Sequence, residues 1–514
     1  EEKFLQTCID SECSETQARW LKCSPFGGGS VAGGGDAWFA LKDNDRLGIR
    51  GMRLRDGPKG MTCTGGEAFG PPCPEDGRSP SFPAQILRAA TWNVELEEEV
   101  GQAVAEIAQL LDVHAALLPT INVLPWLNWG RAQETYGEDP VFSGKMGAAV
   151  VKGVQKDRKV MATVKHFLAN NIENTRWWVS AEMSDKLLHE VYLKAWSIVV
   201  QESSPELIMT SYNRVQGKYP FAHPKFLSLL RDELGFDGSV MTDWFASWEA
   251  ITSGLILGDA GRSSPYWGQK DFMESNSIYT AGVDMEMPFC SKNRDAISKV
   301  QACAVSSSEA CATSNALDEA TVHLLRSKSR YGLLGPPKNN SRPVEWDNHK
   351  FDKLILRVAQ EGIVLLKNDN GFLPKKPSAV SSVVVLGSAE TLELGDKGSS
   401  SVKESGQLVN VLEGLQKKYG SGKVSMIYNK SSESDAKIAG ADMVVIDIGL
   451  DHLFEGEFLP PSSGGDRKYL NLHSWDIELI QGVASLNPNV VVVISAGASV
   501  IVEEFVDKVK GLLW

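Results

Sequence analysis

The sequence has no excess of basic residues, because 52 Lys and Arg stand against 65 Asp and Glu and give a formal net charge of -13 at pH 7. A surface of this sign repels the phosphate backbone of nucleic acids and the anionic headgroups of membranes. The chain also has no apolar run near the roughly 18 residues that a membrane-spanning helix needs. These features argue against nucleic acid and membranes as partners and favour a neutral or cationic ligand.

The cysteines lack the Cys-x-x-Cys spacing of zinc and redox sites, so we expect neither a metal nor another cofactor. Their even number is compatible with disulfides, and Cys63 with Cys73 is the first pair to test. Two Asn-x-Ser acceptor sites, at Asn339 and Asn429, also favour an oxidising compartment, secreted or lumenal. The eight cysteines are Cys8, Cys13, Cys23, Cys63, Cys73, Cys290, Cys303 and Cys311.

The chain begins at Glu1 without an initiator Met or an apolar signal segment. We expect any targeting peptide to have been removed or to lie outside this sequence. The sequence does not indicate the oligomeric state.

At 514 residues the chain is too long for one ordinary core, which predicts two or three domains. From about Phe82 to Leu334, short apolar runs alternate with long amphipathic stretches, a pattern typical of repeated βα units. We therefore expect a TIM-like (β/α)8 barrel over residues 1–334, including an N-terminal extension. The expected strands are His114 to Val123, Lys159 to His166, Glu206 to Tyr212 and Gly238 to Asp243, and the expected helices include Leu96 to Leu111, Ser184 to Val200 and Ala320 to Arg330.

Residues 335–349 are rich in Pro, Asn and Lys and lack periodicity, which indicates an interdomain linker. A second alternating region follows over residues 350–514 and predicts a smaller α/β sandwich domain. Because its sheet looks incomplete where the chain ends, we expect further material at its C-terminus. The expected strands are Ser382 to Gly387, Lys423 to Tyr428, Asp442 to Ile448 and Asn489 to Ser495, and the expected helices are Lys353 to Glu361, Val409 to Tyr419 and Trp475 to Ser485.

Polar side chains follow several of the predicted barrel strands. Arg131 with Glu134, then Lys165 with His166, then Tyr212, then Asp243 each come after a successive strand. Active sites of βα barrels form at the carboxyl ends of the strands, so these groups are candidates for one pocket. Such a set of donors and acceptors suits a polyhydroxylated ligand, and Trp244 offers a flat face for a sugar ring.

These residues lie in a longer series of motifs through which the chain resembles the multidomain β-glucosidases of glycoside hydrolase family 3, over roughly Asp56 to Trp514. The matching stretches are Asp56-Gly57-Pro58, Gly130-Arg131-Ala132-Gln133-Glu134-Thr135-Tyr136-Gly137-Glu138-Asp139-Pro140, Lys165-His166-Phe167, Met209-Thr210-Ser211-Tyr212-Asn213, Met241-Thr242-Asp243-Trp244, Ala281-Gly282-Val283-Asp284-Met285-Glu286-Met287-Pro288, Val364-Leu365-Leu366-Lys367-Asn368 and Gly465-Asp466-Arg467.

The resemblance implies a retaining mechanism in which Asp243 attacks the anomeric carbon and a Glu from the second domain protonates the leaving oxygen. It also implies that Tyr212 lies beside the nucleophile and that Met209 forms an apolar wall near it. Since Lys165 and Arg176 would keep Asp243 ionised, we expect the pKa of its carboxyl group to be low. The residues that resemble the family's grips on sugar hydroxyls are Asp56, Arg131, Lys165, His166 and Arg176.

The resemblance also implies that the acid/base residue belongs to a variable loop of the second domain, which here contains Glu455 and Glu457. In many family members a Glu closely precedes Gly-x-Asp-Arg, whereas here residues 459–464 separate the loop from Gly465-Asp466-Arg467. We favour Glu457, and Glu455 stays open. The residue that acts as general acid should be partly desolvated or close to Asp243, which would raise its pKa.

We therefore expect an exo-acting β-glucosidase that takes a small carbohydrate. A β-xylosidase is the nearest alternative, because the two activities differ in how the pocket treats one CH2OH group, worth ~1 to 3 kcal/mol. A catalytically weakened sugar-binding homologue is the alternative from another class. The His-Asp pair of the family's N-acetylglucosaminidases is not found in the segment from Leu168 to Arg176.

Overall fold

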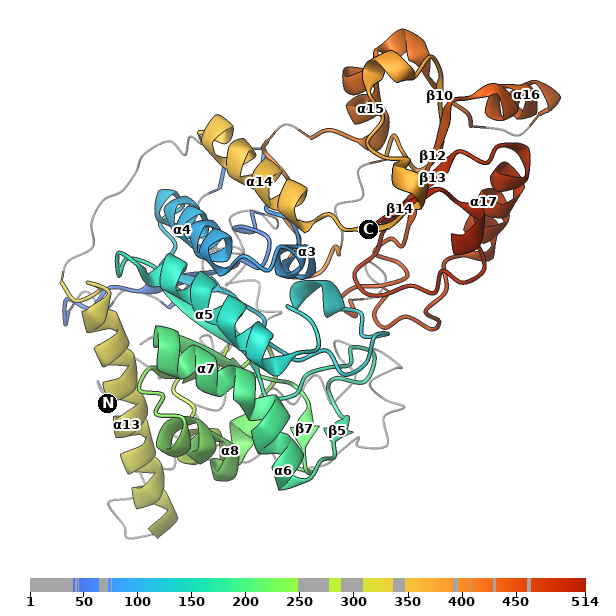
Figure 1. Ribbon diagram of the computed structural model, residues 1–514. Helices are drawn as coiled ribbons and strands as arrows, with labels where there is room; N and C mark the ends of the chain where they lie inside the picture. The colour runs from blue at the N-terminus through green and yellow to red at the C-terminus, as the bar shows by residue number, and fades with distance from the viewer. Residues whose placement is uncertain are drawn as a thin grey trace, which may run out of the picture.

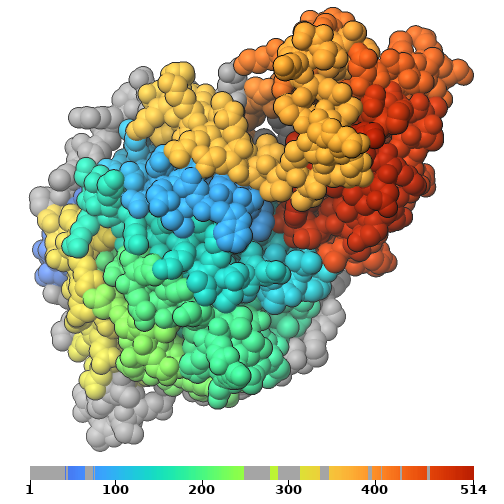
Figure 2. Space-filling view, viewed as in Figure 1, coloured from blue at the N-terminus to red at the C-terminus, as the bar shows by residue number. Residues whose placement is uncertain are grey.

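The structure, a computed structural model, describes most of the chain from residue 40 onward. The described residues are 40–41, 44, 46–63, 73–74, 76–247, 277–287, 308–335, 347–391, 396–406, 408–428, 431–459 and 464–514. Within them the chain forms two bodies, each built on a six-stranded sheet (Figure 1). In the space-filling view the orange and red second body packs against one side of the blue-to-green first body (Figure 2).

The first body is barrel-like, with strand order β1-β2-β3-β4-β6-β8. Neighbouring strands from β2 to β8 are parallel, and a parallel bridge from Met241 to Met285 continues the sheet beyond β8. Strand β1, which precedes the region from Phe82 to Leu334 where βα units were expected, pairs antiparallel with β2. The strands are β1 (Ala40–Leu41), β2 (Met52–Asp56), β3 (Ala115–Leu117), β4 (Met161–Phe167), β6 (Leu207–Thr210) and β8 (Ser239–Met241), and β5 (Ser180–Ala181) pairs separately with β7 (Arg214–Val215). The four expected barrel strands are confirmed as β3, β4, β6 and β8.

Helices cover the outside of this sheet and begin at the residues that local chemistry favours. Asn93 accepts a hydrogen bond from the Leu96 N–H at the start of α4, and Asp139 does the same for Phe142 at the start of α5. Ser184 caps the expected helix by accepting from the Leu187 N–H, and a π-helical turn divides the helix that follows it. The helices are α3 (Gln85–Ala90), α4 (Val94–Leu110), α5 (Pro140–Gln155), α6 (Asp185–Leu187), α7 (Leu193–Ser203), α8 (Pro224–Ser228), α11 (Ser277–Ala281) and α13 (Ser308–Arg330).

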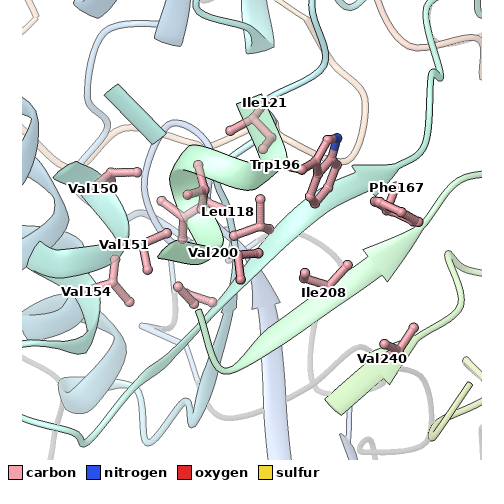
Figure 3. Packing of buried hydrophobic residues seen from close by; sticks show 14 of the residues in the cluster. Leu118, Ile121, Val150, Val151, Val154, Phe167, Trp196, Val200, Ile208 and Val240 are labelled. Carbon is pink, nitrogen blue, oxygen red and sulfur yellow. The ribbon is translucent and has the colours of Figure 1, made fainter. Parts of the chain in front are cut away.

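Side chains of the parallel strands alternate between two apolar clusters. One cluster fills the space between strands and helices and includes Trp196 and Phe167, whose rings meet edge to face at 5.0 Å (Figure 3). The other fills the barrel interior and is rich in methionine. In β6, for example, Leu207 and Met209 belong to the interior cluster, whereas Ile208 belongs to the outer one.

The second body is an α/β sandwich with strand order β11-β10-β12-β13-β14-β9. Its strands are parallel except β9, which pairs antiparallel with β14 at the edge. Separate apolar clusters cover its two faces. The elements are β9 (Leu365–Asn368), β10 (Val383–Gly387), α15 (Val411–Tyr419), β11 (Val424–Met426), α16 (Ser432–Gly440), β12 (Met443–Gly449), α17 (Ser474–Leu486), β13 (Val490–Ser495) and β14 (Gly511–Leu513). The four expected strands are confirmed as β10, β11, β12 and β13.

Helix α14 (Asn348–Gly362) connects the two bodies and packs on barrel helices α3 and α4 (Figure 1). Its buried residues Phe351 and Val358 belong to the barrel's outer cluster. Residues 336–346 of the expected linker lie outside the described residues.

A disulfide joins Cys63 to Cys73, with 5.7 Å between their Cα atoms, which confirms the pair selected from the sequence. Asn339 and Asn429 lie outside the described residues, and no side chain is described for the other six cysteines. None of the helices described is both long and apolar enough to cross a membrane.

Loops after two adjacent strands of the sandwich reach the barrel. The loop after β10 contains Ser399, and the Thr62 hydroxyl donates to its carbonyl at 3.4 Å. The loop after β12 contains Glu455 and Glu457. Parallel α/β sheets bind ligands at the carboxyl ends of their strands, and here that end of the sandwich faces the barrel.

Candidate active site

Strand alternation places three predicted site residues at the top of the barrel interior. Leu54, Met161 and Met241 belong to the apolar cluster of the barrel interior. Asp56, Lys165 and Asp243 follow them by two, four and two residues, and an even spacing along a strand keeps side chains on the same face. All three are buried, and Lys165 Nζ donates to Asp56 Oδ1 at 2.9 Å. The parallel strands therefore gather these charges at one end of the sheet, as the strand pattern predicted for Lys165 and Asp243.

Asp243 is 6% exposed and lies two residues beyond the end of β8. The Trp244 N–H donates to Oδ1 at 2.6 Å, and Oδ2 lies 3.6 Å from His166 Nε2. Burial raises the pKa of Asp243 to about 6, although Arg131, Arg176, the Tyr212 hydroxyl and Lys165 all lower it. The expectation of a low pKa is wrong, because loss of solvation outweighs these neighbours.

His166 is neutral. Burial lowers its pKa well below the usual value, and the charges of Arg131, Lys165 and Arg176 lower it further. The Asn122 amide donates to the His166 carbonyl at 3.0 Å, which orients the amide so that its oxygen faces His166 Nδ1 at 3.3 Å. Nδ1 must then carry the proton, so Nε2 is an acceptor for a ligand hydroxyl.

Two buried guanidinium groups, Arg131 and Arg176, lie between the domains. Arg131 donates to both oxygens of Glu134, at 3.0 and 2.8 Å, which fixes its plane. Arg176 Nη1 donates to Glu457 Oε1 at 2.9 Å, and Arg131 Nη1 lies 3.8 Å from the same oxygen. Both cations also lower the pKa of Asp243, so Asp243 and Glu457 face the same two charges from different domains.

Aromatic and sulfur side chains surround this charged group. The Arg176 guanidinium lies 4.7 Å from the centre of the Tyr212 ring, and Trp177 packs on the same ring at 3.9 Å. Met209 is buried in the interior cluster, and half-buried Trp244 packs against that cluster. The Tyr212 hydroxyl lies beside Asp243 as expected, since it lowers the pKa of that carboxyl group, whereas contact of Met209 and Trp244 with a sugar stays a prediction.

Of the two candidate acids, only Glu457 reaches the barrel charges. The Ser399 N–H donates to its Oε2 at 2.7 Å, while Arg176 holds Oε1. Glu455 instead accepts from the Gly497 N–H at 2.5 Å and lies 3.6 Å from Arg467 Nε. The placement favours Glu457 over Glu455.

The pKa shifts of these two residues run against that choice. Burial acts to raise the pKa of Glu457, but Arg131, Arg176 and the Ser399 N–H outweigh it and hold the pKa well below its usual range. Burial raises the pKa of Glu455 to about 7. The expectation of a raised pKa is therefore wrong for Glu457 in the free protein, because two guanidinium groups compensate its charge.

Asp466 joins the two domains. Its carboxylate accepts hydrogen bonds from the backbone N–H groups of Gly130, Glu173 and Asn174, at 2.9 to 3.0 Å. A Cβ on Gly130 would lie 2.3 Å from the Gly465 carbonyl oxygen, so the backbones approach too closely for a side chain. The Gly465-Asp466-Arg467 element thus fixes the barrel loop that carries Arg176.

Sequence reasoning missed several buried groups of this site. Glu173 precedes Arg176 by one turn and is fully buried beside it. Asp396 follows β10. Burial raises its pKa to about 6, and the negative charges of Glu134 and Glu457 contribute to this rise. Glu173 stands three residues before Arg176, a spacing that could have revealed it, but Asp396 and Ser399 lie in a loop without periodicity.

Comparison with protein families gives two matches in chain order. The glycosyl hydrolase family 3 N-terminal domain matches residues 75–327, and the glycosyl hydrolase family 3 C-terminal domain matches residues 363–514. The first covers most of the barrel and the second covers the sandwich.

Individual relatives agree with these matches. An exo-α-(1→6)-L-arabinopyranosidase of Bifidobacterium breve is 30% identical over 507 residues, covering 94% of this chain and 60% of the relative. A thermostable β-glucosidase B of Acetivibrio thermocellus is 28% identical over 498 residues, with the same coverage of 94% and 60%. The crystal structure of a Bifidobacterium adolescentis β-glucosidase superposes with a TM-score of 0.74 at 27% identity, covering 97% of this chain and 66% of that one.

The chain thus spans 60% of the length of these curated relatives. Its two matched domains, their order and the arrangement of barrel and sandwich agree in sequence and in structure. The chain belongs to glycoside hydrolase family 3.

Proposed function

We propose that this protein is a retaining, exo-acting β-glycosidase that releases terminal glucose from small β-glucosides. The observation that carries the proposal is the convergence of two carboxylates from different domains, Asp243 and Glu457, on Arg131 and Arg176. Glycoside hydrolysis with retention needs two carboxyl groups on either side of the scissile bond, one as nucleophile and one as acid/base. A barrel residue and a loop residue from the second domain supply such a pair.

In the first step an Asp243 oxygen attacks the anomeric carbon while the bond to the leaving oxygen breaks and Glu457 gives that oxygen a proton. In the second step Glu457 takes a proton from water, the water oxygen attacks the same carbon, and the bond to Asp243 breaks. Oδ2 is the oxygen for attack, because it accepts no hydrogen bond of good geometry from the described residues. The backbone N–H of Trp244 already holds Oδ1.

The ion pairs around Glu457 fit the second step directly, since a general base must be ionised. The first step needs a protonated Glu457. Sugar hydroxyls that draw Arg131 and Arg176 toward the ligand would weaken both ion pairs and raise the pKa of Glu457. Substrate binding thereby prepares the acid.

The remaining sugar contacts follow from the inward-facing polar groups. Asp56 and Lys165 form a buried pair that offers both an acceptor and a donor to adjacent hydroxyls. His166 Nε2 is a further acceptor, and Trp244 supplies an apolar face. The Cys63–Cys73 disulfide supports an oxidising location, secreted or lumenal.

Two other functions remain as alternatives. A β-xylosidase would use the same carboxylates on a pentose, and the arabinopyranosidase among the relatives supports including pentosides in any substrate test. A weakened sugar-binding homologue would bind glucose without hydrolysing unactivated glucosides, because its acid would be ineffective.

The test measures kcat/KM of the full-length protein on the 4-nitrophenyl glycosides of β-D-glucose, β-D-xylose and α-L-arabinopyranose, and on cellobiose. NMR of the first product records its anomeric form. Preference for the glucoside, turnover of cellobiose and initial release of β-glucose support the proposal. Initial release of α-glucose excludes retention, preference for the xyloside supports the first alternative, and turnover of the activated glucoside alone supports the second.

A further inference from the structure

Glu173 is a fully buried carboxylate that the proposed mechanism does not use. Three donors hold it: Trp129 Nε1 reaches Oε1 at 2.9 Å, while Arg176 Nη1 and the Phe458 N–H reach Oε2 at 2.7 and 3.3 Å. Burying a carboxylate and ordering three donors around it costs free energy, which an apolar residue at the same position would not. Its placement therefore calls for a specific role.

The three donors come from three separate segments. Trp129 belongs to the loop after β3, Arg176 to the loop after β4, and Phe458 to the sandwich loop that carries the acid. Phe458 directly follows Glu457, so a hydrogen bond to the Phe458 N–H fixes the peptide that joins the two residues. Glu173 thus holds the backbone of the acid from the barrel side.

Glu173 also shares a cation with the acid. Arg176 Nη1 donates to Glu173 Oε2 at 2.7 Å and to Glu457 Oε1 at 2.9 Å, one contact for each N–H of that nitrogen. Two carboxylates therefore divide the charge of one guanidinium group. When Glu457 takes up a proton, Glu173 is the group beside Arg176 that still balances its charge.

We propose that Glu173 is a positioning residue for the acid/base step, which fixes the Glu457 loop and retains the charge of Arg176 so that Glu457 can be protonated. This inference rests on the proposed function, because it assigns Glu173 a part in the same reaction. Glu173 acts through Arg176 and Phe458 and needs no contact with the substrate.

Electrostatic repulsion couples the two carboxyl groups. Burial raises the pKa of Glu173 to about 7, although Arg176 and Arg131 lower it, and the charge of Glu457 raises it further. Coulomb repulsion is mutual, so an ionised Glu173 also favours the protonated form of Glu457. The charged and titratable groups that face Glu457 are Arg131, Arg176, Glu173, Asp56, Asp396 and Tyr212.

The test compares Glu173→Gln, which removes the charge at constant size, with Glu173→Asp, which keeps the charge. For Glu173→Gln we expect kcat/KM on cellobiose to fall ~10-fold or more and kcat/KM on 2,4-dinitrophenyl β-glucoside to fall less than about 3-fold, because an activated leaving group needs little acid. The basic limb of the pH profile of kcat on cellobiose, which reports the pKa values of the bound complex, should move to lower pH in Glu173→Gln, since Arg176 then stabilises ionised Glu457 alone. Glu173→Asp should return that limb toward its original position.

Glu97→Gln is the matched control. Glu97 is an equally buried barrel carboxylate that pairs with Arg88 and accepts from Tyr136, outside the site. Its loss should reduce stability without changing the ratio of the two substrates. Equal losses on both substrates in Glu173→Gln, or no loss on either, would overturn the inference.

Hydrogen exchange gives a readout that does not depend on activity. The peptide containing Phe458 should exchange faster in Glu173→Gln than in the original protein, whereas Glu97→Gln should leave it unchanged. Unchanged exchange at Phe458 contradicts the positioning role even if no glycoside is hydrolysed. Failure of the original protein to hydrolyse any glycoside, together with faster exchange in Glu173→Gln, instead removes the proposed function and leaves Glu173 as the support of this loop.

Discussion

Arg176 Nη1 lies 2.9 Å from Glu457 Oε1, so a guanidinium group of the barrel forms a buried ion pair with a carboxylate of the sandwich domain. The same cation lowers the pKa of Asp243. Arg176, together with Arg131, therefore lowers the pKa of both proposed catalytic carboxyl groups. The pH dependence of the reaction should report this coupling.

The acid limb of kcat/KM should reflect Asp243, whose pKa of about 6 means that the nucleophile becomes ionised as the pH rises through that value. Arg176→Gln removes a cation that lowers this pKa, so the acid limb should move upward by about one pH unit. The control is Arg330→Gln, which removes a half-buried arginine paired with Asp237, away from the site. An acid limb that does not move in Arg176→Gln contradicts the coupling.

Asp243→Asn should stabilise the protein at neutral pH. The folded pKa of about 6 lies above the value near 4 of an unfolded Asp, so the ionised residue costs about 3 kcal/mol above pH 6. The stability that protonated Asp243 gives is complete below pH 4 and is lost as the pH rises through 6. Calorimetry should therefore show that the variant exceeds the original protein in stability by more at pH 8 than at pH 4. An equal difference in stability at both pH values would contradict this prediction.

Exchanging each candidate acid for Gln should separate them. Glu457→Gln should lower kcat/KM on cellobiose about 100-fold or more and change kcat/KM on 2,4-dinitrophenyl β-glucoside much less. Glu455→Gln should affect both substrates alike, because Glu455 bonds to Gly497 and Arg467 within its own domain. The reverse pattern would move the acid role to Glu455, whose pKa of about 7 suits a general acid.

The strand pattern predicted the barrel part of the site because it depends on local rules. Buried runs defined the strands that carry Lys165 and Asp243 at their carboxyl ends, whereas Asp56 was expected only from the family resemblance. The contacts of Glu457 and Asp466 join residues about 280 or more positions apart, in loops without periodicity, so spacing could not predict them. The pKa of Asp243 had the wrong expected direction because neighbouring cations are visible in the sequence but complete burial is not.

Asp466→Asn should weaken the junction between the domains. The carboxylate accepts backbone hydrogen bonds from Gly130, Glu173 and Asn174, and a neutral amide offers one acceptor oxygen instead of two. We expect faster hydrogen exchange in the peptides that contain these three residues and a loss of stability of about 1 to 3 kcal/mol. The control, Asp442→Asn, removes an exposed carboxylate that accepts from Ser381 and Ser382 within the sandwich. If both variants left the three peptides unchanged, Asp466 would not hold the junction.

The central claim, that Asp243 is the nucleophile, is tested most directly by trapping the covalent intermediate. A 2-deoxy-2-fluoro β-glucoside with an activated leaving group should inactivate the full-length protein and add one sugar to it, because the fluorine slows the second step more than the activated first step. Peptide mapping by mass spectrometry should place that sugar on Asp243. A label on another carboxylate, or full inactivation of Asp243→Ala by the same reagent, would contradict the account.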